Sequence, residues 1–239
     1  MTTSVDVVIL AGGLGTRLQS VVSDRPKVLA EVKGRPFLDY LLQQLEKFRQ
    51  VKKVILALGY QAEKVMAQYQ KYSSQTFTID FSTETQPLGT GGAIRRALLK
   101  TESRDVLIMN GDSYVHFDLT ALQQEHEKKG GVLTNILFKT DDRRRFGTVT
   151  LDSQTNRIKE FQEKSPSELV DHESAFINAG VYLIQKQVFE KWPVDQNVSM
   201  EKEILPTLIP AGIYGHVSQG PFIDIGIPES YREAENFSW

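Results

Sequence analysis

Short apolar runs alternate with segments of helical spacing over the first 110 residues, and this alternation constrains the fold more than any other feature of the sequence. The apolar runs are Val5–Ala11 (interrupted by Asp6), Val54–Leu58 and Val106–Met109, and they are typical of strands buried on both faces of a sheet. The segments between them predict helices over Phe37–Phe48, Gln61–Tyr69 and Gly92–Leu99, and a strand that carries Phe77, Ile79 and Phe81. This order predicts a parallel sheet covered by helices, with right-handed crossovers.

The chain changes character after residue 130. Strand patterns follow one another at Val132–Phe138, Thr148–Leu151, Arg157–Gln162 and Phe176–Ile184, before helical segments at Met200–Leu208 and Glu229–Asn236. No linker-like or repetitive segment separates the two parts. For 239 residues we therefore expect one domain (1–239), with an α/β half to about residue 130 and a strand-rich half (131–239) on the same sheet.

Composition excludes several classes of protein. The chain has no cysteine, so it can form no disulfide, Cys-ligated zinc site, iron–sulfur cluster or Cys nucleophile. A net charge of -2 argues against bulk electrostatic binding to nucleic acid or to anionic membranes. No apolar run approaches the roughly 20 residues that span a bilayer, and the N-terminus lacks the basic region of a secretory signal. We expect a cytoplasmic protein that binds neither nucleic acid nor membrane.

A glycine-rich loop follows the first apolar run. Its residues are Leu10, Ala11, Gly12, Gly13, Leu14, Gly15, Thr16 and Arg17. Because glycine has no Cβ, such a loop lets backbone N–H groups approach a phosphate closely. Lys27 follows Pro26, whose fixed φ stiffens the chain, so Lys27 is a candidate second clamp on a polyphosphate.

Two familiar phosphate-binding loops do not fit these residues. A dinucleotide-binding loop needs a third glycine where Leu18 stands and an acidic residue after the second strand, where Gly59 and Tyr60 stand instead. A Walker A loop needs a Gly-Lys pair that this loop lacks. A tight turn without a ligand is the remaining alternative, although three glycines and the Arg17 cation exceed what a turn requires.

Two aspartates are candidate metal ligands. Asp112 follows the apolar run Val106–Met109, and ligands collect at the carboxyl ends of parallel strands. Asp224 lies between apolar neighbours, where an unpaired carboxylate would cost much desolvation energy. A divalent cation removes that difficulty, and Mg²⁺ accepts one or two carboxylates together with phosphate oxygens. The alternative for Asp112 is a cap on the segment that follows it.

The glycine loop, with Arg25-Pro26-Lys27 behind it, is the first of a series of motifs that spans almost the whole chain. The others are Glu84 with Pro87–Ala93, Asn110–Asp112, Phe146–Val149, Glu163-Lys164, Asn178–Gly180 and Asp224–Gly226. In residue type and order the series resembles the sugar-phosphate nucleotidyltransferases (nucleoside-diphosphate-sugar pyrophosphorylases). The resemblance implies a Rossmann-like three-layer α/β/α fold, with a mostly parallel central sheet and a strand-rich sugar-binding half.

The resemblance also implies roles for individual residues. The nucleotide-binding residues would be Leu10, Ala11, Gly12, Gly13, Gly15, Thr16, Arg17, Lys27, Glu84, Gly89 and Gly111. The sugar-phosphate-binding residues would be Gly147, Glu163, Lys164 and Asn178, and the Mg²⁺ ligands would be Asp112 and Asp224. Arg17, Lys27, Asp112 and Asp224 would be the catalytic residues. The basic run Arg143–Arg145 is either a solvated loop or a rim of the sugar-phosphate site.

The implied reaction converts a nucleoside triphosphate (NTP) and a sugar 1-phosphate into an NDP-sugar and pyrophosphate. The nucleophile is an oxygen of the sugar phosphate, which is already anionic, so no general base is needed. The compact length and the segment Phe222–Glu229 look most like D-glycero-α-D-manno-heptose 1-phosphate guanylyltransferases, enzymes of surface-heptose biosynthesis in bacteria. That likeness favours GTP as the nucleotide. Because few residues follow Asp224, we expect no appended β-helical domain.

Other interpretations remain open at this stage. Mannose-1-phosphate guanylyltransferases and short uridylyl- and thymidylyltransferases share nearly every motif. A catalytically silent nucleotide-binding subunit would keep the fold but would normally lose Arg17, Lys27 or an acid, and all of these are present. An NAD(P)-dependent oxidoreductase would need the missing third glycine and ribose-binding acid. Members of the family commonly self-associate, so the resemblance allows a homo-oligomer.

Overall fold

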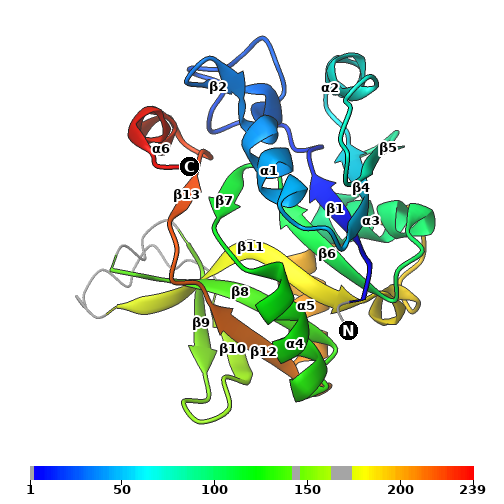
Figure 1. The fold of residues 1–239 in the computed structure, drawn as a ribbon, viewed down its shortest axis with the longest axis vertical. Helices are drawn as coiled ribbons and strands as arrows, with labels where there is room; N and C mark the ends of the chain where they lie inside the picture. The colour runs from blue at the N-terminus through cyan, green and yellow to red at the C-terminus, as the bar shows by residue number, and fades with distance from the viewer. Residues whose placement is uncertain (1–2, 142–145, 163–173) are drawn as a thin grey trace.

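The computed structural model describes residues 3–141, 146–162 and 174–239. Within these residues, nine strands form one mixed sheet (Figure 1). The strands are β1 (Val5–Leu10), β4 (Val51–Leu58), β5 (Thr78–Thr83), β6 (Asp105–Asn110), β8 (Leu133–Thr140), β9 (Thr148–Leu151), β10 (Ile158–Gln162), β11 (Ala175–Gln185) and β12 (Ile213–Val217). The sheet continues through both halves of the chain, as the sequence predicts.

The two halves of the sheet differ in strand direction. β5, β4, β1 and β6 lie side by side and are all parallel, so their carboxyl ends share one edge. β11 then runs antiparallel to β6, and it also pairs with β8 and β9. β10 pairs with β9, and β12 runs parallel to β8. The mostly parallel nucleotide-type half and the strand-rich half therefore meet at β6 and β11.

Helices cover both faces of the sheet. The helices are α1 (Phe37–Glu46), α2 (Ala62–Tyr69), α3 (Gly89–Ala97), α4 (Leu119–Lys129), α5 (Leu205–Leu208) and α6 (Pro228–Glu233). Alternate strand residues divide the core in two: Val7 and Ile9 pack with α1, α2 and α4, and Val8 packs with α3 and α5. This arrangement confirms the three-layer α/β/α fold.

Shorter elements complete the chain. The 3₁₀ turns are η1 (Lys27–Leu29), η2 (Leu98–Lys100), η3 (Lys186–Phe189) and η5 (Ala234–Asn236), and η4 (Met200–Ile204) is a π-helical turn. Two small two-stranded sheets pair β2 (Glu31–Val32) with β3 (Arg35–Pro36) and β7 (Ser113–Val115) with β13 (Phe222–Asp224). The second of these carries the two predicted metal-binding acids to one place.

The structure differs from the predicted elements at several points. α3 begins at Gly89 rather than at Gly92, because the backbone of Val198 accepts the N–H groups of Gly91 and Gly92 and supports the first turn. The predicted helix Met200–Leu208 is π-helical in its first turn and α-helical after it. Helix α4 has no strong apolar stripe and is not predicted by spacing.

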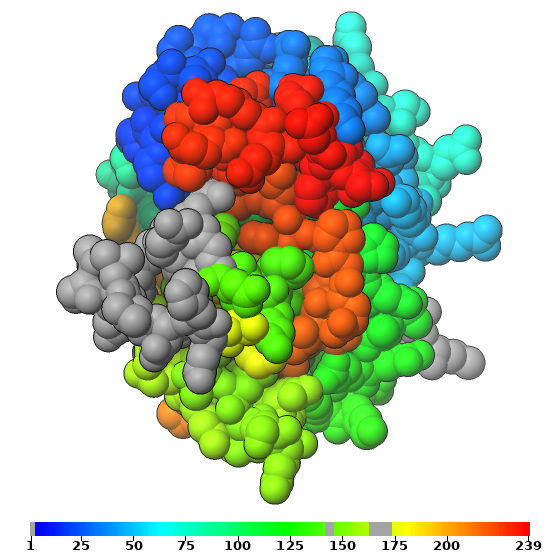
Figure 2. All heavy atoms as spheres, turned by 90° about the vertical axis from the view of Figure 1, so that its left-hand side faces the viewer, coloured from blue at the N-terminus to red at the C-terminus, as the bar shows by residue number. Residues whose placement is uncertain are grey.

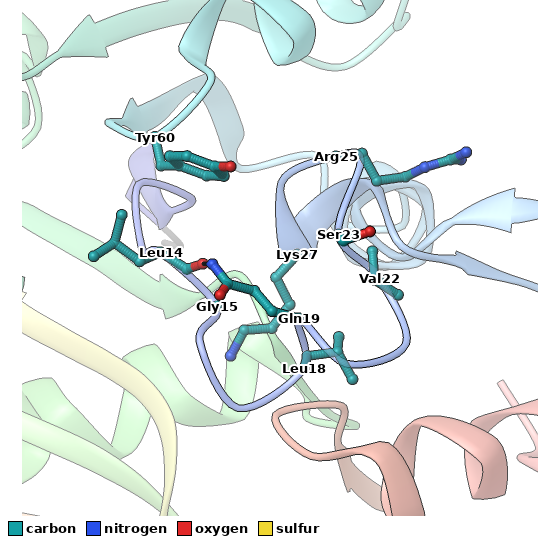
Figure 3. A pocket seen from close by; sticks show the side chains of 9 residues that line it. All are labelled: Leu14, Gly15, Leu18, Gln19, Val22, Ser23, Arg25, Lys27 and Tyr60. Carbon is teal, nitrogen blue, oxygen red and sulfur yellow. Dashed lines mark hydrogen bonds between the residues drawn. The ribbon is translucent and has the colours of Figure 1, made fainter.

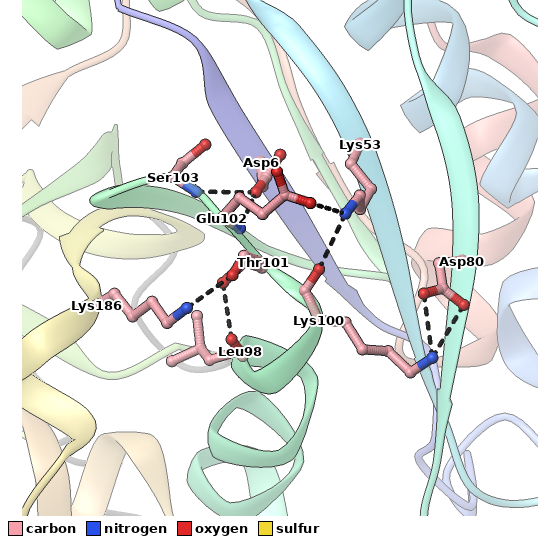
Figure 4. A network of polar contacts seen from close by, with 9 residues as sticks. All are labelled: Asp6, Lys53, Asp80, Leu98, Lys100, Thr101, Glu102, Ser103 and Lys186. Atoms are coloured by element: carbon pink, nitrogen blue, oxygen red, sulfur yellow. Dashed lines mark hydrogen bonds and ion pairs between the residues drawn. The ribbon is translucent and has the colours of Figure 1, made fainter.

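A polar network fixes the edge of the sheet where the parallel strands begin (Figure 4). The buried carboxylate of Asp6 accepts the backbone N–H groups of Glu102 (2.6 Å) and Ser103 (3.0 Å). Lys53 on β4 pairs with Glu102 (2.9 Å) and also donates to the carbonyl of Lys100. These contacts join β1, β4 and the segment that precedes β6 at the edge opposite to the strands' carboxyl ends.

Segments from the two ends of the chain pack together. Figure 2 shows the red C-terminal segment against the blue N-terminal one. Tyr231 Oη donates to the carbonyl of Glu31 (2.6 Å), and Glu235 accepts from the backbone N–H of Lys33. Trp239 stacks on Tyr40 of α1, with ring centroids 3.8 Å apart. Among the described residues, no helix combines the length and apolar character needed to cross a lipid bilayer.

Candidate nucleotidyltransferase site

The glycine loop after β1 presents unpaired backbone donors. Within the described part of the chain, the N–H groups of residues 12–17 donate no hydrogen bond, whereas the next N–H, that of Leu18, donates to the carbonyl of Gly15 (2.8 Å). A Cβ on Gly12 would lie 2.8 Å from the backbone nitrogen of Gly59, so only glycine allows the loop to pack on the end of β4. The loop is therefore held at its base and leaves its donors available to an anion.

Lys27 lies beside this loop and is paired with an acid. Its Nζ lies 2.5 Å from Asp112 Oδ2, and both side chains are largely shielded from solvent. Gly15 has a φ of +62°, and a Cβ there would lie 3.4 Å from Lys27 Cβ. The sequence predicts a phosphate clamp at Lys27, and the structure places its ammonium between the loop and the carboxyl end of β6.

Asp112 and Asp224 converge through the pairing of β7 with β13. Asp224 is the register partner of Ser113, and Ile225 N–H donates to the carbonyl of Asp112 (2.9 Å). The Ser113 hydroxyl lies 3.1 Å from Asp224 Oδ2 and 3.3 Å from Asp112 Oδ1. Gly226 N–H donates to Asp224 Oδ1 (2.9 Å). Two acids more than one hundred residues apart in the chain thus share one hydroxyl contact.

The electrostatics of this pair favour a bound cation. Burial raises the pKa of Asp224 above its ordinary value, and the neighbouring Asp112 carboxylate raises it further. Gly226 N–H, Lys27 and Ser113 act in the opposite direction. Two ionised carboxylates that lie close together and partly shielded from water destabilise the fold unless a positive charge lies near both of them.

Arg17 reaches the same place from the glycine loop. A Cβ on Gly226 would lie 2.7 Å from Asp224 Oδ1 and 3.4 Å from Arg17 Nη2, so the guanidinium and this acid flank the same glycine. Arg17 is exposed, and within the described residues its guanidinium forms no hydrogen bond or ion pair. An unpaired guanidinium at this position is suited to bind a phosphate in a bidentate manner.

A small hollow lies under the glycine loop (Figure 3). It is lined by Leu14, Gly15, Leu18, Gln19, Val22, Ser23, Arg25, Lys27 and Tyr60. Tyr60 closes it from the end of β4, and its backbone N–H donates to the carbonyl of Gly12 (3.2 Å). Lys27 is common to the hollow and to the acid pair, so the hollow adjoins the candidate site.

Glu84 and Gly89 lie at the end of the neighbouring parallel strand, β5. Glu84 Oε2 accepts the backbone N–H of Leu88 (3.1 Å), and burial raises the pKa of the Glu84 carboxyl. Gly89 begins α3 with a φ of +68° and is exposed. The structure therefore places both predicted base-binding residues at the same edge of the sheet as the glycine loop, with Glu84 fixing the turn before Gly89.

Asn178 and Gly147 approach the site from the strand-rich half. Asn178 Oδ1 accepts the N–H of Gly180 (2.9 Å), and its Nδ2 donates to Tyr182 Oη (2.5 Å). β11 is irregular between Asn178 and Val181, and a Cβ on Gly180 would lie 2.6 Å from Asn110 Nδ2, so this bend lies against the end of β6. Phe146, which precedes Gly147, packs edge-on against Phe222 of β13 (5.5 Å between centroids).

Some predicted residues lie outside the described part of the chain. These are Glu163, Lys164 and Arg143–Arg145. Leu10, Ala11, Gly13, Thr16 and Gly111 lie in it, at or directly after the carboxyl ends of β1 and β6. Sequence reasoning assigned no role to Ser113, which contacts both acids.

The residues present fit a divalent cation such as Mg²⁺. No group of three or more His, Cys, Asp or Glu residues in the described ranges could hold a metal ion. Two convergent carboxylates are nevertheless what Mg²⁺ uses when phosphate oxygens and waters supply its other ligands. The hydroxyl contact that links Asp112 to Asp224 shows that their oxygens face a common point.

Comparison with known proteins agrees with this geometry. Residues 6–238 match the family model described as nucleotidyl transferase. The chain belongs to the nucleotidyl transferase family. It is 37% identical over 232 residues to a D-glycero-alpha-D-manno-heptose 1-phosphate guanylyltransferase of Aneurinibacillus thermoaerophilus, with 96% of each chain covered.

Two further relatives extend the comparison. Mannose-1-phosphate guanylyltransferase of Mycobacterium tuberculosis is 34% identical, but this chain spans only 63% of its length. The crystal structure of HddC from Yersinia pseudotuberculosis superposes with a TM-score of 0.84 at 35% identity, covering 97% of this chain and 98% of that one. HddC has also been solved in complex with GMP-PN. The fold and the enzyme family that the sequence motifs predict are thereby confirmed.

Proposed function

We propose that this nucleotidyltransferase is a sugar-1-phosphate guanylyltransferase. It would convert GTP and D-glycero-α-D-manno-heptose 1-phosphate into the GDP-heptose and pyrophosphate. Similarity over almost the full length of a heptose 1-phosphate guanylyltransferase supports the sugar, and the GMP-PN complex of the similar HddC supports the guanine nucleotide. The mannose-specific relative is covered only in part, which makes mannose 1-phosphate the second candidate.

One observation carries the proposal. Among the described residues, the N–H groups of residues 12–17 and the guanidinium of Arg17 form no hydrogen bond; Lys27 pairs with Asp112, and Arg17 and Asp224 flank Gly226. Hydrogen-bond donors that can bind an anion therefore lie next to carboxylates that can bind a cation. A triphosphate with a divalent cation is a ligand that uses both sets together.

The transfer requires no acid–base residue on the protein. An oxygen of the sugar phosphate attacks the α-phosphorus of GTP, the bond from that phosphorus to the β-phosphate oxygen breaks, and pyrophosphate leaves. The nucleophile is already anionic, so no proton has to be removed. Catalysis then consists of positioning the two phosphates in line and stabilising the charge that develops.

The chain's own residues divide these tasks. The N–H groups of residues 12–17 and Arg17 would hold the departing pyrophosphate. Lys27, held at the end of β6 by Asp112, would contact the α-phosphate. Glu84 and Gly89 would bind the base, while Asn178, Gly147, Glu163 and Lys164 would bind the sugar phosphate. Residues 1–130 would thus form the nucleotide-binding half, and residues 131–239 the sugar-phosphate-binding half, of a single domain.

Asp112 and Asp224 would hold the divalent cation, for which we propose Mg²⁺. When bound, the cation neutralises phosphate charge that the protein's cations alone do not balance. GTP is a cytosolic nucleotide, and we therefore place the reaction in the cytoplasm. The product would be an activated heptose donor for surface-polysaccharide synthesis.

A release assay tests the proposal directly. The purified protein is incubated with MgCl₂, each of the four common NTPs and the 1-phosphates of the heptose, mannose and glucose, and pyrophosphate is measured. We expect the highest kcat/KM for GTP with the heptose 1-phosphate.

Asp112→Asn serves as the matched inactive control, because it keeps the shape of the side chain and removes its charge. A higher kcat/KM for mannose 1-phosphate would transfer the assignment to that sugar. Absence of pyrophosphate with every pair would favour a catalytically silent subunit.

A further inference from the structure

A cavity of about 490 Å³ lies at the edge of the sheet where the parallel strands begin, opposite to the candidate active site. We propose that this cavity is a second binding site and that its ligand is an uncharged sugar. The inference does not depend on the proposed guanylyltransferase activity. The cavity is lined by Thr3, Ser4, Glu102, Ser103, Arg104, Asp105, Gln123, Gln124, His126, Glu127, Gly130, Leu183 and Gln185.

The cavity has the size and shape of a ligand site. Small-molecule pockets commonly measure about 300–1,000 Å³, whereas one ordered water needs only roughly 10–15 Å³. Ser4, Arg104 and Glu127 are exposed around it, and His126 inside it is only 4% exposed. Among the lining residues, all of them in the described ranges, Leu183 alone has an apolar side chain. A lining of this kind suits a polar ligand that enters from solvent.

Three buried polar atoms in this lining have no hydrogen-bond partner within the described part of the chain. They are His126 Nε2, Asp105 Oδ1 and Gln123 Oε1. The other ends of two of these side chains are fixed, because His126 Nδ1 contacts Thr134 Oγ1 (2.9 Å) and Gln123 Nε2 donates to the carbonyl of Thr3 (2.9 Å). Folded proteins leave few buried polar atoms unpaired, so three in one cavity indicate a polar occupant.

The contact with Thr134 determines which nitrogen of His126 carries the proton. Burial lowers the pKa of His126 below its ordinary value of 6.5, against the opposing effect of Asp105, so the ring is neutral at pH 7. The Thr134 hydroxyl is fully buried, and Nδ1 is its one hydrogen-bond partner among the described residues. The hydroxyl must therefore donate to Nδ1, which leaves the ring proton on Nε2.

A donor and an acceptor thus lie side by side without reaching each other. His126 Nε2 is 4.0 Å from Asp105 Oδ1, and Arg104 Nε is 3.9 Å from the same oxygen, so both distances are too long for a hydrogen bond. A ligand hydroxyl about 2.8 Å from Nε2 and Oδ1 would accept from the first and donate to the second. Gln123 lies one helical turn before His126 on α4 and would accept from a second hydroxyl. Hydroxyls on neighbouring carbons, as in a sugar, supply both interactions.

The charges of the lining exclude other classes of ligand. Glu102, Asp105 and Glu127 outnumber the single cation of Arg104, so a phosphate group is disfavoured and neither GTP nor a nucleotide sugar fits. An ammonium ion has no lone pair with which to accept the proton on Nε2 of His126. An apolar molecule would leave all three buried atoms unpaired. An uncharged molecule with several hydroxyl groups satisfies every one of these conditions.

The cavity is separate from the candidate active site. Asp105 begins β6 and Asp112 follows its other end, and the six residues of the strand span roughly 20 Å. Glu102 and Ser103, which line the cavity, belong instead to the polar network around Asp6 (Figure 4). A sugar bound here would therefore not compete with GTP.

Nuclear magnetic resonance of the full chain labelled with ¹⁵N-histidine tests the site. Glutamine substitutions of His116, His172 and His216, one at a time, assign the four rings by elimination. D-mannose, D-galactose and myo-inositol are the uncharged probes, and inorganic phosphate and methylammonium chloride are the anionic and cationic ones. We expect His126 to carry its proton on Nε2, and this nitrogen to shift saturably with at least one uncharged probe. The ring of His116, which is exposed outside the cavity, should not shift.

Variants of the lining test the assigned contacts. Asp105→Asn keeps the shape of the side chain and removes the charged acceptor, and Gln123→Leu removes the other acceptor. We expect each to weaken sugar binding by about tenfold. Gln68→Leu is the matched control, because it makes the same change at an exposed position on α2, and it should keep the wild-type affinity. Circular dichroism establishes that each variant is folded.

The outcomes separate a sugar site from the alternatives. No saturable shift with any uncharged probe would overturn the inference, since water alone would then fill the cavity. Tighter binding of phosphate or methylammonium would overturn the class of ligand. The titrations are repeated with saturating GTP and MgCl₂, and loss of sugar binding there would place the sugar in the active site and overturn the second site. Pyrophosphate release is measured separately, so the two proposals can fail independently.

Discussion

Lys27 connects the anion-binding loop to the acid pair at the level of single side chains. Its ammonium is paired with Asp112, 2.5 Å away, and little of it is exposed. Such a pair holds the lysine extended toward the site before substrate arrives. The contact also offsets the charge of one of the two acids, so the lysine stabilises the acid pair and lies where the proposed function needs a phosphate-binding group.

Removal of this charge should affect turnover far more than folding. We expect Lys27→Ala to lower kcat/KM by about 100- to 1000-fold, as loss of one charged stabiliser of a transition state commonly does. The measurement is steady-state pyrophosphate release with saturating sugar 1-phosphate. Lys52→Ala is the control, because Lys52 is an exposed lysine on β4 whose ammonium contacts only the carbonyl of Arg49 among the described residues. Near-normal kcat/KM in Lys27→Ala would contradict the assignment.

Asp224 should limit the stability of the metal-free protein at neutral pH. Its pKa is raised in the folded state by burial and by Asp112, so the ionised carboxylate destabilises the fold at pH values above that pKa. The penalty shrinks as the pH falls through that raised pKa toward the ordinary value of 3.8, and it is absent only below the ordinary value, where the folded and unfolded forms both carry the proton. We expect Asp224→Asn to raise the unfolding free energy by about 1 kcal/mol at pH 7, or the Tm by about 2–4 °C.

Thermal unfolding in EDTA at pH 7 and near pH 4 measures this effect. The gain should be clearly smaller at the lower pH. Asp152→Asn is the control of opposite sign, because Lys159 and Thr155 hold the pKa of Asp152 below its ordinary value by hydrogen bonding to the carboxylate. That variant should lose stability at pH 7. An Asp224→Asn protein no more stable than the wild type at pH 7 would show that the acid pair carries no such penalty.

At the scale of whole elements, the start of α3 depends on a single carbonyl. Val198 O accepts the N–H groups of Gly91 (2.9 Å) and Gly92 (3.2 Å), and Val198 N–H donates to the carbonyl of Leu88 (2.9 Å). The segment before η4 therefore caps α3 in place of a side chain. Because Gly89 directly adjoins this cap, the backbone at the predicted base-binding position is determined by packing between α3 and a segment more than one hundred residues away.

A methyl group at Gly89 should break this cap. A Cβ there would lie 2.6 Å from Val198 O, and its φ of +68° disfavours any other residue. We expect Gly89→Ala to cost about 2–4 kcal/mol, the sum of left-handed strain and steric overlap, and to raise the KM for GTP. Urea denaturation and initial-rate kinetics measure the two effects.

Gly130→Ala isolates the steric part of that cost. Gly130 ends α4 with a similar φ of +62°, but a Cβ there meets nothing within 4 Å. This control should lose only about 1 kcal/mol and keep the wild-type KM. Equal losses in the two variants would mean that the Val198 carbonyl yields to a side chain and does not fix the site.

On the scale of the whole molecule, the sequence predicts well those strands and strand ends that depend on local hydrophobic periodicity. Buried strands such as β1, β4 and β6 are apolar on both faces, so their runs are visible without knowledge of their partners. The carboxyl-edge position of Asp112 follows from the same pattern, and the structure confirms it. Predicted strand Thr148–Leu151 matches β9 in both bounds.

Features that depend on distant partners could not be predicted in this way. β7 and β13 have three residues each, too few to show a period, and they exist because they pair with each other. Helix α4 buries few apolar residues. It depends instead on the Asp118 cap and on the buried His126, which contacts Thr134. The contact of Ser113 with Asp224 arises from this pairing, and the contact of Lys27 with Asp112 joins residues 85 positions apart, so neither leaves a local trace in the sequence.

The two edges of the parallel sheet therefore serve different purposes. The candidate site lies at the carboxyl edge, where Asp112 and the glycine loop emerge from β6 and β1. The opposite edge is fastened by Asp6, which accepts two backbone N–H groups from the segment before β6 (Figure 4). The six residues of β1 separate these edges by roughly 20 Å, so stability and catalysis should respond to separate substitutions.

Asp6→Ala tests this separation. It leaves the N–H groups of Glu102 and Ser103 without their acceptor, and loss of hydrogen bonds to a buried charge costs about 2–3 kcal/mol. We expect the urea midpoint to fall accordingly while kcat, measured well below the unfolding temperature, stays within about twofold of the wild type. Asp6→Asn retains one acceptor oxygen of the same shape, and its loss of stability should be smaller. If kcat falls in parallel with stability in both variants, the two edges are coupled through the strands, and the network in Figure 4 positions the site as well as fastening the sheet.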